Sequence, residues 1–169
     1  RVWLNLDGQA LTLVTAHAST GAWSYSDSSR TLAEGQHNLS LQVEDKAGNL
    51  GVLRTQIFTV DTVAPLPPVV LRMSADTDSG SSNTDRVTRN TLPSFSGTAE
   101  PGSTVVLYLG SSTTAFATVI VDQDGNWSAT LDSALTTAGN FSVRGKATDP
   151  AGNVSALGTA LNFVFDNAA

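Results

Sequence analysis

The sequence predicts an all-β fold of tandem β-sandwich modules, the first of which is incomplete at its N-terminal side. Short runs of alternating apolar and polar residues fill the chain between turn residues, and no segment keeps the apolar spacing of a helix. Valine, threonine, serine, glycine and alanine dominate, which is typical of strands and turns. In addition, two motifs recur at one fixed spacing, which indicates a repeated module.

The repeated motifs lie 104 residues apart. Ala-Trp-Ser around Trp23 returns as Asn-Trp-Ser around Trp127, and Asp-Lys-Ala-Gly-Asn at 45–49 returns as Asp-Pro-Ala-Gly-Asn at 149–153. Because two separate motifs share one spacing, the repeating unit is about one domain in length. Modules repeated in series favour a rod or an array over an enzyme.

The same spacing leaves part of the first copy without a counterpart. It places Arg1 opposite Val105, so nothing in the first copy matches residues 63–104. We therefore expect a partial module of C-terminal strands over residues 1–61 and a complete module over residues 62–169. Either the chain is a piece of a longer one, which fits the absence of an initiator methionine and a signal peptide, or the first module borrows strands from elsewhere.

Alternation and turn residues predict the individual strands in order. In the first copy we expect five strands, over residues 2–6, 12–17, 23–26, 37–43 and 52–60. In the second copy we expect seven strands, over residues 68–73, 93–97, 104–109, 116–121, 127–131, 140–147 and 157–165. Seven strands in about 100 residues, with short turns between them, indicate an immunoglobulin-like sandwich.

Composition excludes several classes of function. The net charge is −6 with 9 basic residues and no basic cluster, so neither nucleic acid nor an anionic membrane surface is an expected partner. No apolar run is long enough to insert into a membrane. The absence of cysteine excludes disulfides, thiol catalysis and cysteine-ligated zinc. The acidic excess suits divalent cations, which prefer carboxylate oxygens.

The joint between the modules is rich in proline. It runs through Asp-Thr-Val-Ala-Pro-Leu-Pro-Pro at 61–68. Proline fixes its own φ angle and keeps the preceding residue extended, so this linker is stiff. A short, stiff linker holds consecutive modules end to end.

Four segments resemble one family. Asp-Thr-Val-Ala-Pro (61–65), Ser-Gly-Thr-Ala-Glu-Pro-Gly-Ser (96–103), Asp-Gly-Asn-Trp (124–127) and Thr-Asp-Pro-Ala-Gly-Asn (148–153) are similar to the bacterial Ig-like repeats of giant, type I-secreted, non-fimbrial adhesins. The resemblance implies a cell-adhesion stalk, secreted or on the bacterial cell surface and linked to virulence. It implies neighbouring repeats as partners, a distal domain that contacts host-cell or surface glycans, and calcium that makes the domain junctions rigid.

Successive loops of an antiparallel sandwich lie at alternate ends of the module. The order of the expected strands therefore assigns each acidic loop residue of the complete module to one of its two ends. The end where the linker enters gathers one set around Asp61, namely Glu100, Asp122, Asp124 and Asp149. The opposite end gathers Asp76, Asp78, Asp85 and Asp166. Converging carboxylates repel one another unless a cation bridges them, and Ca²⁺ accepts about 6–8 oxygens in flexible geometry. We therefore expect Ca²⁺ to be bound by these acids, with Asp61, Glu100 and Asp149 bridging the joint.

Each acid also has a purely structural interpretation. Asp124 and Gly125 can form a simple hairpin turn, because the first copy keeps the glycine as Gly21 without the acids. Asp149 can hold a self-bonded turn, and residues 76–80 can be a polar surface loop. That loop fails as an EF-hand, because Val87 stands where the bidentate glutamate belongs.

No catalytic constellation is evident, and we expect the chain not to be an enzyme. His17 and His37 have no counterparts in the second copy and fit surface or strand roles, and no nucleophile elbow or phosphate-binding loop occurs. Trp23 and Trp127 are expected to be core anchors. The alternative function is a carbohydrate-binding module or an accessory domain of an extracellular enzyme. It would need an exposed aromatic platform or a groove on a sheet face, for which Trp3 and Tyr25 are candidates.

Overall fold

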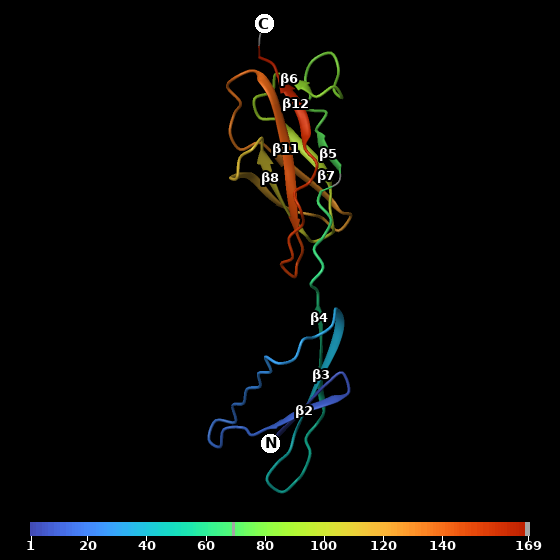
Figure 1. Cartoon of the computed structure of the whole chain (residues 1–169), viewed down its shortest axis with the longest axis vertical. Helices are drawn as coiled ribbons and strands as arrows, with labels where there is room; N and C mark the ends of the chain where they lie inside the picture. Colours follow the sequence, from blue (N-terminus) through green and yellow to red (C-terminus); the bar gives the residue numbers. More distant parts are fainter. Residues whose placement is uncertain (69, 168–169) are drawn as a thin grey trace. The chain divides into compact units, whose positions relative to one another are not determined.

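The computed structural model describes residues 1–68 and 70–167, and these residues form strands and turns (Figure 1). The chain divides into two compact units, Arg1–Thr62 and Val63–Ala169, hereafter unit 1 and unit 2. The all-β prediction is confirmed, since the described part of the chain contains no α-helix. Accordingly, none of the described residues lies in a helix that could cross a membrane.

Unit 2 is a sandwich of two sheets. The smaller sheet has the order β10-β7-β5, and its strands are β5 (Val70–Met73), β7 (Ser94–Thr98) and β10 (Asn126–Thr130). The larger sheet has the order β6-β12-β11-β8-β9, and its strands are β6 (Val87–Thr88), β8 (Thr104–Leu109), β9 (Ala115–Ile120), β11 (Gly139–Thr148) and β12 (Leu161–Phe165). All neighbouring strands run antiparallel except β6 and β12, which are parallel.

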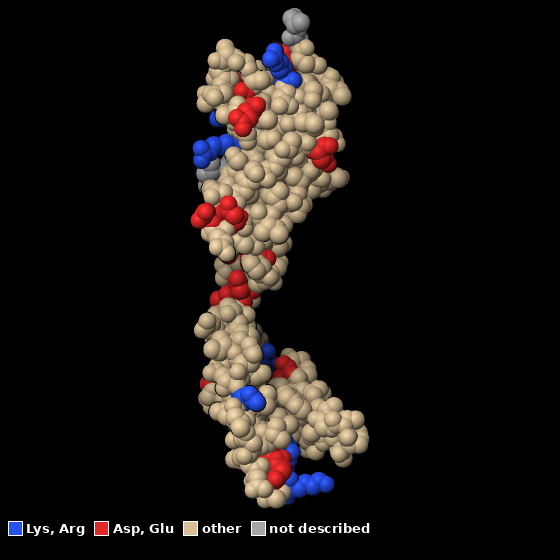
Figure 2. Space-filling view, turned by 180° about the vertical axis from the view of Figure 1, so that it is seen from behind, with Lys and Arg blue, Asp and Glu red and all other residues tan. Residues whose placement is uncertain are grey.

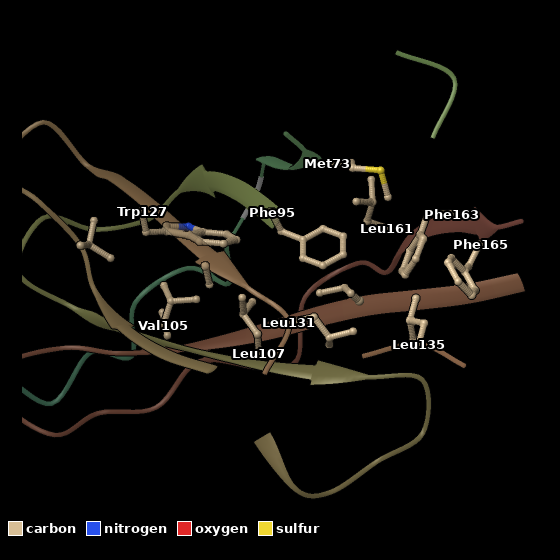
Figure 3. Close-up of a cluster of buried hydrophobic side chains, with 14 residues drawn as sticks. Met73, Phe95, Val105, Leu107, Trp127, Leu131, Leu135, Leu161, Phe163 and Phe165 are labelled. Atoms are coloured by element: carbon tan, nitrogen blue, oxygen red, sulfur yellow. The ribbon is translucent and has the colours of Figure 1, made fainter. Parts of the chain in front are cut away.

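The core of unit 2 lies between these sheets. Alternate side chains of β8 and β10 point inward, so that Val105, Leu107 and Trp127 are buried and their neighbours are not. Phe95 of β7 is fully buried, and its ring centroid lies 5.4 Å from that of Phe163 in β12 (Figure 3). An aromatic contact at this distance and tilt adds to the burial of apolar area. The two sheets are thus held together mainly by aromatic and branched aliphatic side chains.

Unit 1 is a single sheet of four strands. The order is β2-β1-β3-β4, and the strands are β1 (Val2–Leu6), β2 (Gln9–Val14), β3 (Gly35–Val43) and β4 (Arg54–Val60). The turn between β1 and β2 consists of Asp7 and Gly8, both at positive φ (52° and 80°). Two such residues in succession form the primed turn whose twist matches a hairpin.

This sheet repeats four of the five strands of the larger sheet of unit 2, with β2, β1, β3 and β4 corresponding to β9, β8, β11 and β12. Val2 pairs with Val43 as Val105 pairs with Ala147, and both first hairpins have an irregularity at the same place in the register. The isolated bridge Glu44–Leu50 likewise has its counterpart in Thr148–Val154. The register corrects one sequence prediction, because Val2, and not Arg1, is the equivalent of Val105.

One predicted strand is absent, and one short strand was not predicted. The strand expected at 23–26 is not formed, although its equivalent β10 is a regular strand in unit 2. The reason is that β10 pairs with β7, and unit 1 contains no equivalent of β7. Strand β6 was not predicted, because two residues are too short for alternation to show.

The core of unit 2 leads to a first prediction. Replacing Phe95 by alanine should lower the free energy of unfolding of unit 2 by about 3–5 kcal/mol, because it leaves a cavity between the sheets. Replacing Ile120, which is 77% exposed in the same unit, should change it by less than about 0.5 kcal/mol. Urea unfolding followed on amide signals of unit 2 measures both. A loss below about 1 kcal/mol for Phe95→Ala would contradict the described core.

Candidate functional site

Three acidic loops meet at one end of unit 2, as the sequence predicted. The backbone N–H of Ala99 donates to the carbonyl of Gly125 at 3.0 Å, and that of Gly102 donates to the carbonyl of Val121 at 3.1 Å. A Cβ added to Gly102 would lie 3.8 Å from Cγ of Pro150. The loops that carry Glu100, the two acids of the 122–126 turn and Asp149 are therefore neighbours.

Asp122 and Asp149 stabilise their own turns. Asp122 Oδ1 accepts hydrogen bonds from the backbone N–H groups of Asp124 and Asn126 at 3.0 and 2.7 Å. Asp149 Oδ1 accepts from the backbone of Asn153, and Oδ2 accepts from its Nδ2, each at 2.8 Å. These bonds fix the chain direction by satisfying backbone donors that the turn leaves open.

The first unit contains the same turn. Asp45 accepts from the backbone and from Nδ2 of Asn49, both at 2.9 Å, in the way Asp149 accepts from Asn153. The repeated Asp-x-Ala-Gly-Asn motif is therefore a turn whose first and last residues bind each other. The structural interpretation given to Asp149 accounts for both of its carboxylate oxygens.

Burial and hydrogen bonding act in opposite directions on these carboxylates. Burial raises the pKa of Asp149, but hydrogen bonds from the side chain and backbone of Asn153 outweigh it, and the pKa lies below the ordinary value. Hydrogen bonds from Asn49 lower the pKa of Asp45. Both groups are therefore ionised at neutral pH.

The other predicted acids of the linker-end set are Glu100 and Asp124 in unit 2 and Asp61 in unit 1. Glu100 and Asp124 are exposed, and the backbone carbonyl of Glu100 accepts from the hydroxyl of Ser103 at 2.6 Å. Asp61 is half-buried and belongs to unit 1, where it follows β4. Across the residues that the structure describes, no three His, Asp or Glu side chains form a group that could hold a metal ion.

At the opposite end of unit 2, Asp78 differs from the other acids. It is 4% exposed, Oδ2 accepts from the backbone N–H of Arg86 at 3.1 Å, and Oδ1 is buried without a hydrogen-bond partner among the described residues. An unpaired buried carboxylate oxygen is costly unless a proton, a water or a cation satisfies it. The sequence placed Asp78 among the possible ligands but gave no sign of its burial.

The other predicted residues at this end lie around the same loop. Asp76 and Asp85 are exposed, and Asp85 Oδ1 accepts from the backbone of Val87 at 3.1 Å. The backbone N–H of Asp166 donates to the carbonyl of Thr88 at 2.8 Å, so the end of β12 lies beside the loop. On the face shown in Figure 2, acidic side chains form small separate groups on a largely uncharged surface.

A hollow of about 500 Å³ adjoins Asp78. Oxygen-bearing side chains of Ser74, Asn83 and Thr84 line it, together with the cationic side chains of Arg72 and Arg86. The hollow thus places neutral oxygen donors, which Ca²⁺ accepts, beside the Asp78 side chain, whereas its two arginines disfavour a cation.

A second hollow, of about 670 Å³, lies on unit 1 and is termed the Trp3 groove. Its lining includes Trp3, the polar side chains of Asn5, Ser40 and Gln42, and the apolar side chains of Leu50 and Leu53. Trp3 is 46% exposed, and its indole N–H donates to Oε2 of Glu44 at 2.8 Å. The sequence suggested Trp3 as an exposed aromatic residue, but the groove depends on strand pairing that the sequence alone did not reveal.

Three further aromatic residues were given roles by the sequence, and the structure agrees with the prediction for Trp127 only. Tyr25 is half-buried, and its hydroxyl donates to Oδ2 of Asp27 at 3.1 Å. Trp127 is a core residue as expected, with 4% exposure. Trp23 was expected to be one too, but it is 40% exposed because no second sheet covers it.

His37 has a structural role. Its ring is buried and stacked on Phe58, with centroids 5.5 Å apart, as Phe141 is stacked on Phe163 in unit 2. Nδ1 lies 2.6 Å from Oδ2 of Asp7, and Nε2 lies 2.8 Å from the carbonyl of Ala33. Because both nitrogens face acceptors, the imidazolium form fits this site and neither nitrogen is open to act as a base. His17 is exposed, with Nδ1 3.2 Å from the Ser19 hydroxyl.

A comparison with protein families matches the bacterial Ig-like domain over residues 1–62 and 65–167. No curated protein is a significant match. The family model thus matches both units, including the one that has a single sheet.

Several solved structures are similar over nearly the whole chain. One is a tetra-tandem repeat in the extending region of a large adhesion protein, with 23% identity and a TM-score of 0.48, covering 99% of this chain and 42% of that one. Another is the BSP domain of a biofilm associated protein, with 17% identity and a TM-score of 0.40, covering 99% of this chain and 25% of that one. A third comprises fibronectin(III)-like modules of CbhA from Clostridium thermocellum, with 12% identity and a TM-score of 0.44, covering 98% and 77%. The chain spans less than half the length of the first two.

The contacts of His37 predict a pH dependence for unit 1. The hydrogen bond to Ala33, and then that to Asp7, raise its pKa above the ordinary value of 6.5. The protonated ring therefore contributes fully to stability below about pH 6.5, and the contribution is lost as the pH rises through the raised pKa. Urea unfolding of unit 1 from about pH 5 to pH 9 should show this loss. His37→Phe, which copies Phe141, should remove it, and an unchanged pH profile in that variant would contradict this role.

Proposed function

We propose that this chain, which belongs to the bacterial Ig-like domain family, is part of the structural stalk of a secreted bacterial surface adhesin. The observation that carries the proposal is the tandem repetition: the same arrangement of four strands, with the same register and the same Asp–Asn turn, occurs in both units. The work of such a stalk is mechanical, since it spaces a distal binding domain from the cell. Neighbouring repeats are its partners, and it carries out no catalysis.

The linker supports this proposal because each of its ends is fixed in its own unit. In unit 1, the backbone N–H and hydroxyl of Thr62 donate to Oε2 of Glu34 at 2.9 and 2.6 Å. In unit 2, Pro68 packs on Gly145, where an added Cβ would come within 3.4 Å of its ring. A linker with anchored ends and prolines between them has few conformations left.

We further propose that Ca²⁺ stiffens the stalk through two sets of acids. At the linker end the set is Asp61, Glu100, Asp122, Asp124 and Asp149, and at the opposite end it is Asp76, Asp78, Asp85 and Asp166. The strongest support is the buried, unpaired oxygen of Asp78 beside a hollow with neutral oxygen donors. Support is weaker for Asp122 and Asp149, whose oxygens already accept hydrogen bonds within their turns.

The calcium proposal is tested by calorimetry and small-angle scattering on the whole chain. Ca²⁺ at about 100 times its dissociation constant should stabilise unit 2 by about 2.7 kcal/mol. Asp78→Asn should abolish this effect, whereas Asp132→Asn, an exposed acid of the same unit outside both sets, should retain it. Asp61→Ala should keep the stabilisation of unit 2 but remove the calcium-dependent change in scattering. Identical scattering with calcium and with chelator, together with no heat of binding, would contradict the proposal.

A second candidate function is glycan binding, which the Trp3 groove favours. An aromatic side chain on a sheet face, flanked by amide and hydroxyl groups, can stack on a sugar ring and bind its hydroxyl groups. If this function holds, neutral polysaccharides embedded in a native gel should retard the chain. Trp3→Ala should abolish the retardation, and Ile57→Ala, an exposed apolar residue of β4, should preserve it. Equal mobility with and without polysaccharide would exclude the function.

A further inference from the structure

A third hollow, of about 360 Å³, lies on the outer face of the larger sheet of unit 2 and is termed the Arg144 groove. Arg144 and Lys146 of β11 and Tyr108 of β8 line it. The two β11 residues alternate with Val143 and Ala147, which are buried in the core, so their side chains point away from the other sheet. The volume of the groove lies within the range of about 300–1,000 Å³ that is typical of small-molecule sites.

The Trp3 groove of unit 1 occupies the equivalent place on its own sheet. Two residues that line it, Asn5 and Ser40, pair across β1 and β3. The residues at the same register positions of unit 2 are Tyr108 and Arg144, which pair across β8 and β11. The sheet is thus hollowed at one place in both units, but the charge differs. The Trp3 groove includes Glu44, whereas none of the described residues that line the Arg144 groove is acidic.

The two cations of the Arg144 groove are not neutralised by carboxylates of the protein. Within the part of the chain that the structure describes, neither Arg144 nor Lys146 forms an ion pair. Nη2 of Arg144 donates to the carbonyl of Gly110 at 3.0 Å, and Nε is buried with no hydrogen-bond partner among the described residues. Because a half-buried guanidinium has lost part of its water, its charge and that of Lys146 favour an anionic group in the groove.

Hydroxyl groups complete the lining of the groove. The loop between β8 and β9 is held by Ser112, whose Oγ donates to the carbonyl of Thr114 and accepts from its backbone N–H, each at 3.0 Å. The hydroxyl groups of Tyr108, Ser111 and Thr113 also belong to the lining, and they make no hydrogen bond to another described residue. Because a hydroxyl group both donates and accepts, these three suit the hydroxyl groups of a sugar.

The position of the groove disfavours a peptide as its ligand. Strands β8 and β11 are inner strands of the larger sheet, and each is paired on both sides. A peptide that binds by strand addition needs an open sheet edge. The backbone groups of β8 and β11 are already used in their ladders, so recognition in the groove depends on side chains.

We propose that the Arg144 groove binds a saccharide that carries carboxylate groups. Arg144 and Lys146 bind the carboxylate through charge-assisted hydrogen bonds, and the hydroxyl groups of Tyr108, Ser111 and Thr113 bind those of the sugar. The chain has a net charge of −6, which repels a densely charged polyanion such as nucleic acid more than a saccharide with one charge per sugar ring. This site is independent of the stalk proposal and of neutral glycan binding in the Trp3 groove.

Titration of the whole chain with a tetramer of galacturonic acid tests the proposal, with chelator present so that calcium cannot bridge carboxylates. The NMR amide signals of residues 108–113 should shift on binding, and signals of unit 1 report the Trp3 groove separately. Lys146→Gln should weaken the affinity measured by calorimetry by about tenfold or more. Arg89→Gln removes the same charge from an exposed position of unit 2 outside the groove and should leave the affinity unchanged.

Two matched ligands complete the test. The methyl ester of the same tetramer keeps its ring hydroxyl groups but has no charge, so it should bind at least about tenfold more weakly. Equal affinity for acid and ester, an equal loss in the two variants, or no shift of residues 108–113 by the acid while unit 2 stays folded would overturn the proposal. A glutamate tetramer that shifts these signals with the same affinity would overturn the assignment of the ligand to a saccharide.

Discussion

A β-sheet with one apolar face must bury that face against a second layer, and much of this molecule follows from that constraint. In unit 2, the requirement is met by two sheets whose inward side chains meet around Phe95 and Trp127. In unit 1, the same sheet forms with the same register but has no facing sheet. The register of the sheet is therefore determined by its own strands, whereas the burial of a residue such as Trp23 depends on a second, facing sheet.

The aspartate side chains of this chain differ in how many of their oxygens accept hydrogen bonds within their own loops. Asp45, Asp122 and Asp149 accept hydrogen bonds from backbone groups within four residues, which shapes the loops they occupy. Asp78 instead leaves one buried oxygen unsatisfied. Acidic composition alone therefore does not identify a cation site, and the decisive quantity is the number of oxygen lone pairs that local structure leaves open.

Much of the fold could be predicted from the sequence because its strands are half-buried and alternate clearly. The strands at 2–6 and 104–109 have the predicted bounds, and the repeat spacing identified both Asp–Asn turns. Tertiary context decided the rest. The segment around Trp23 has strand sequence but no partner, β6 is too short to show alternation, and the Trp3 groove arises from residues that only strand pairing brings together. The burial of Asp78 likewise depends on the packing of its loop.

The connectivity of unit 2 also determines how it would respond to tension. The chain enters beside Gly145 and Gly158, where Pro67 and Pro68 pack, and it leaves at Asp166 beside Thr88. The backbone of β12, the last strand, pairs with β11 on one side and with β6 on the other. Because ladder hydrogen bonds lie across the strands, a pull along the module shears all the bonds of β12 together. The hydrogen bonds of such a strand must break at the same time, so the strand resists a larger force than a hairpin pulled from one end, whose bonds break one after another.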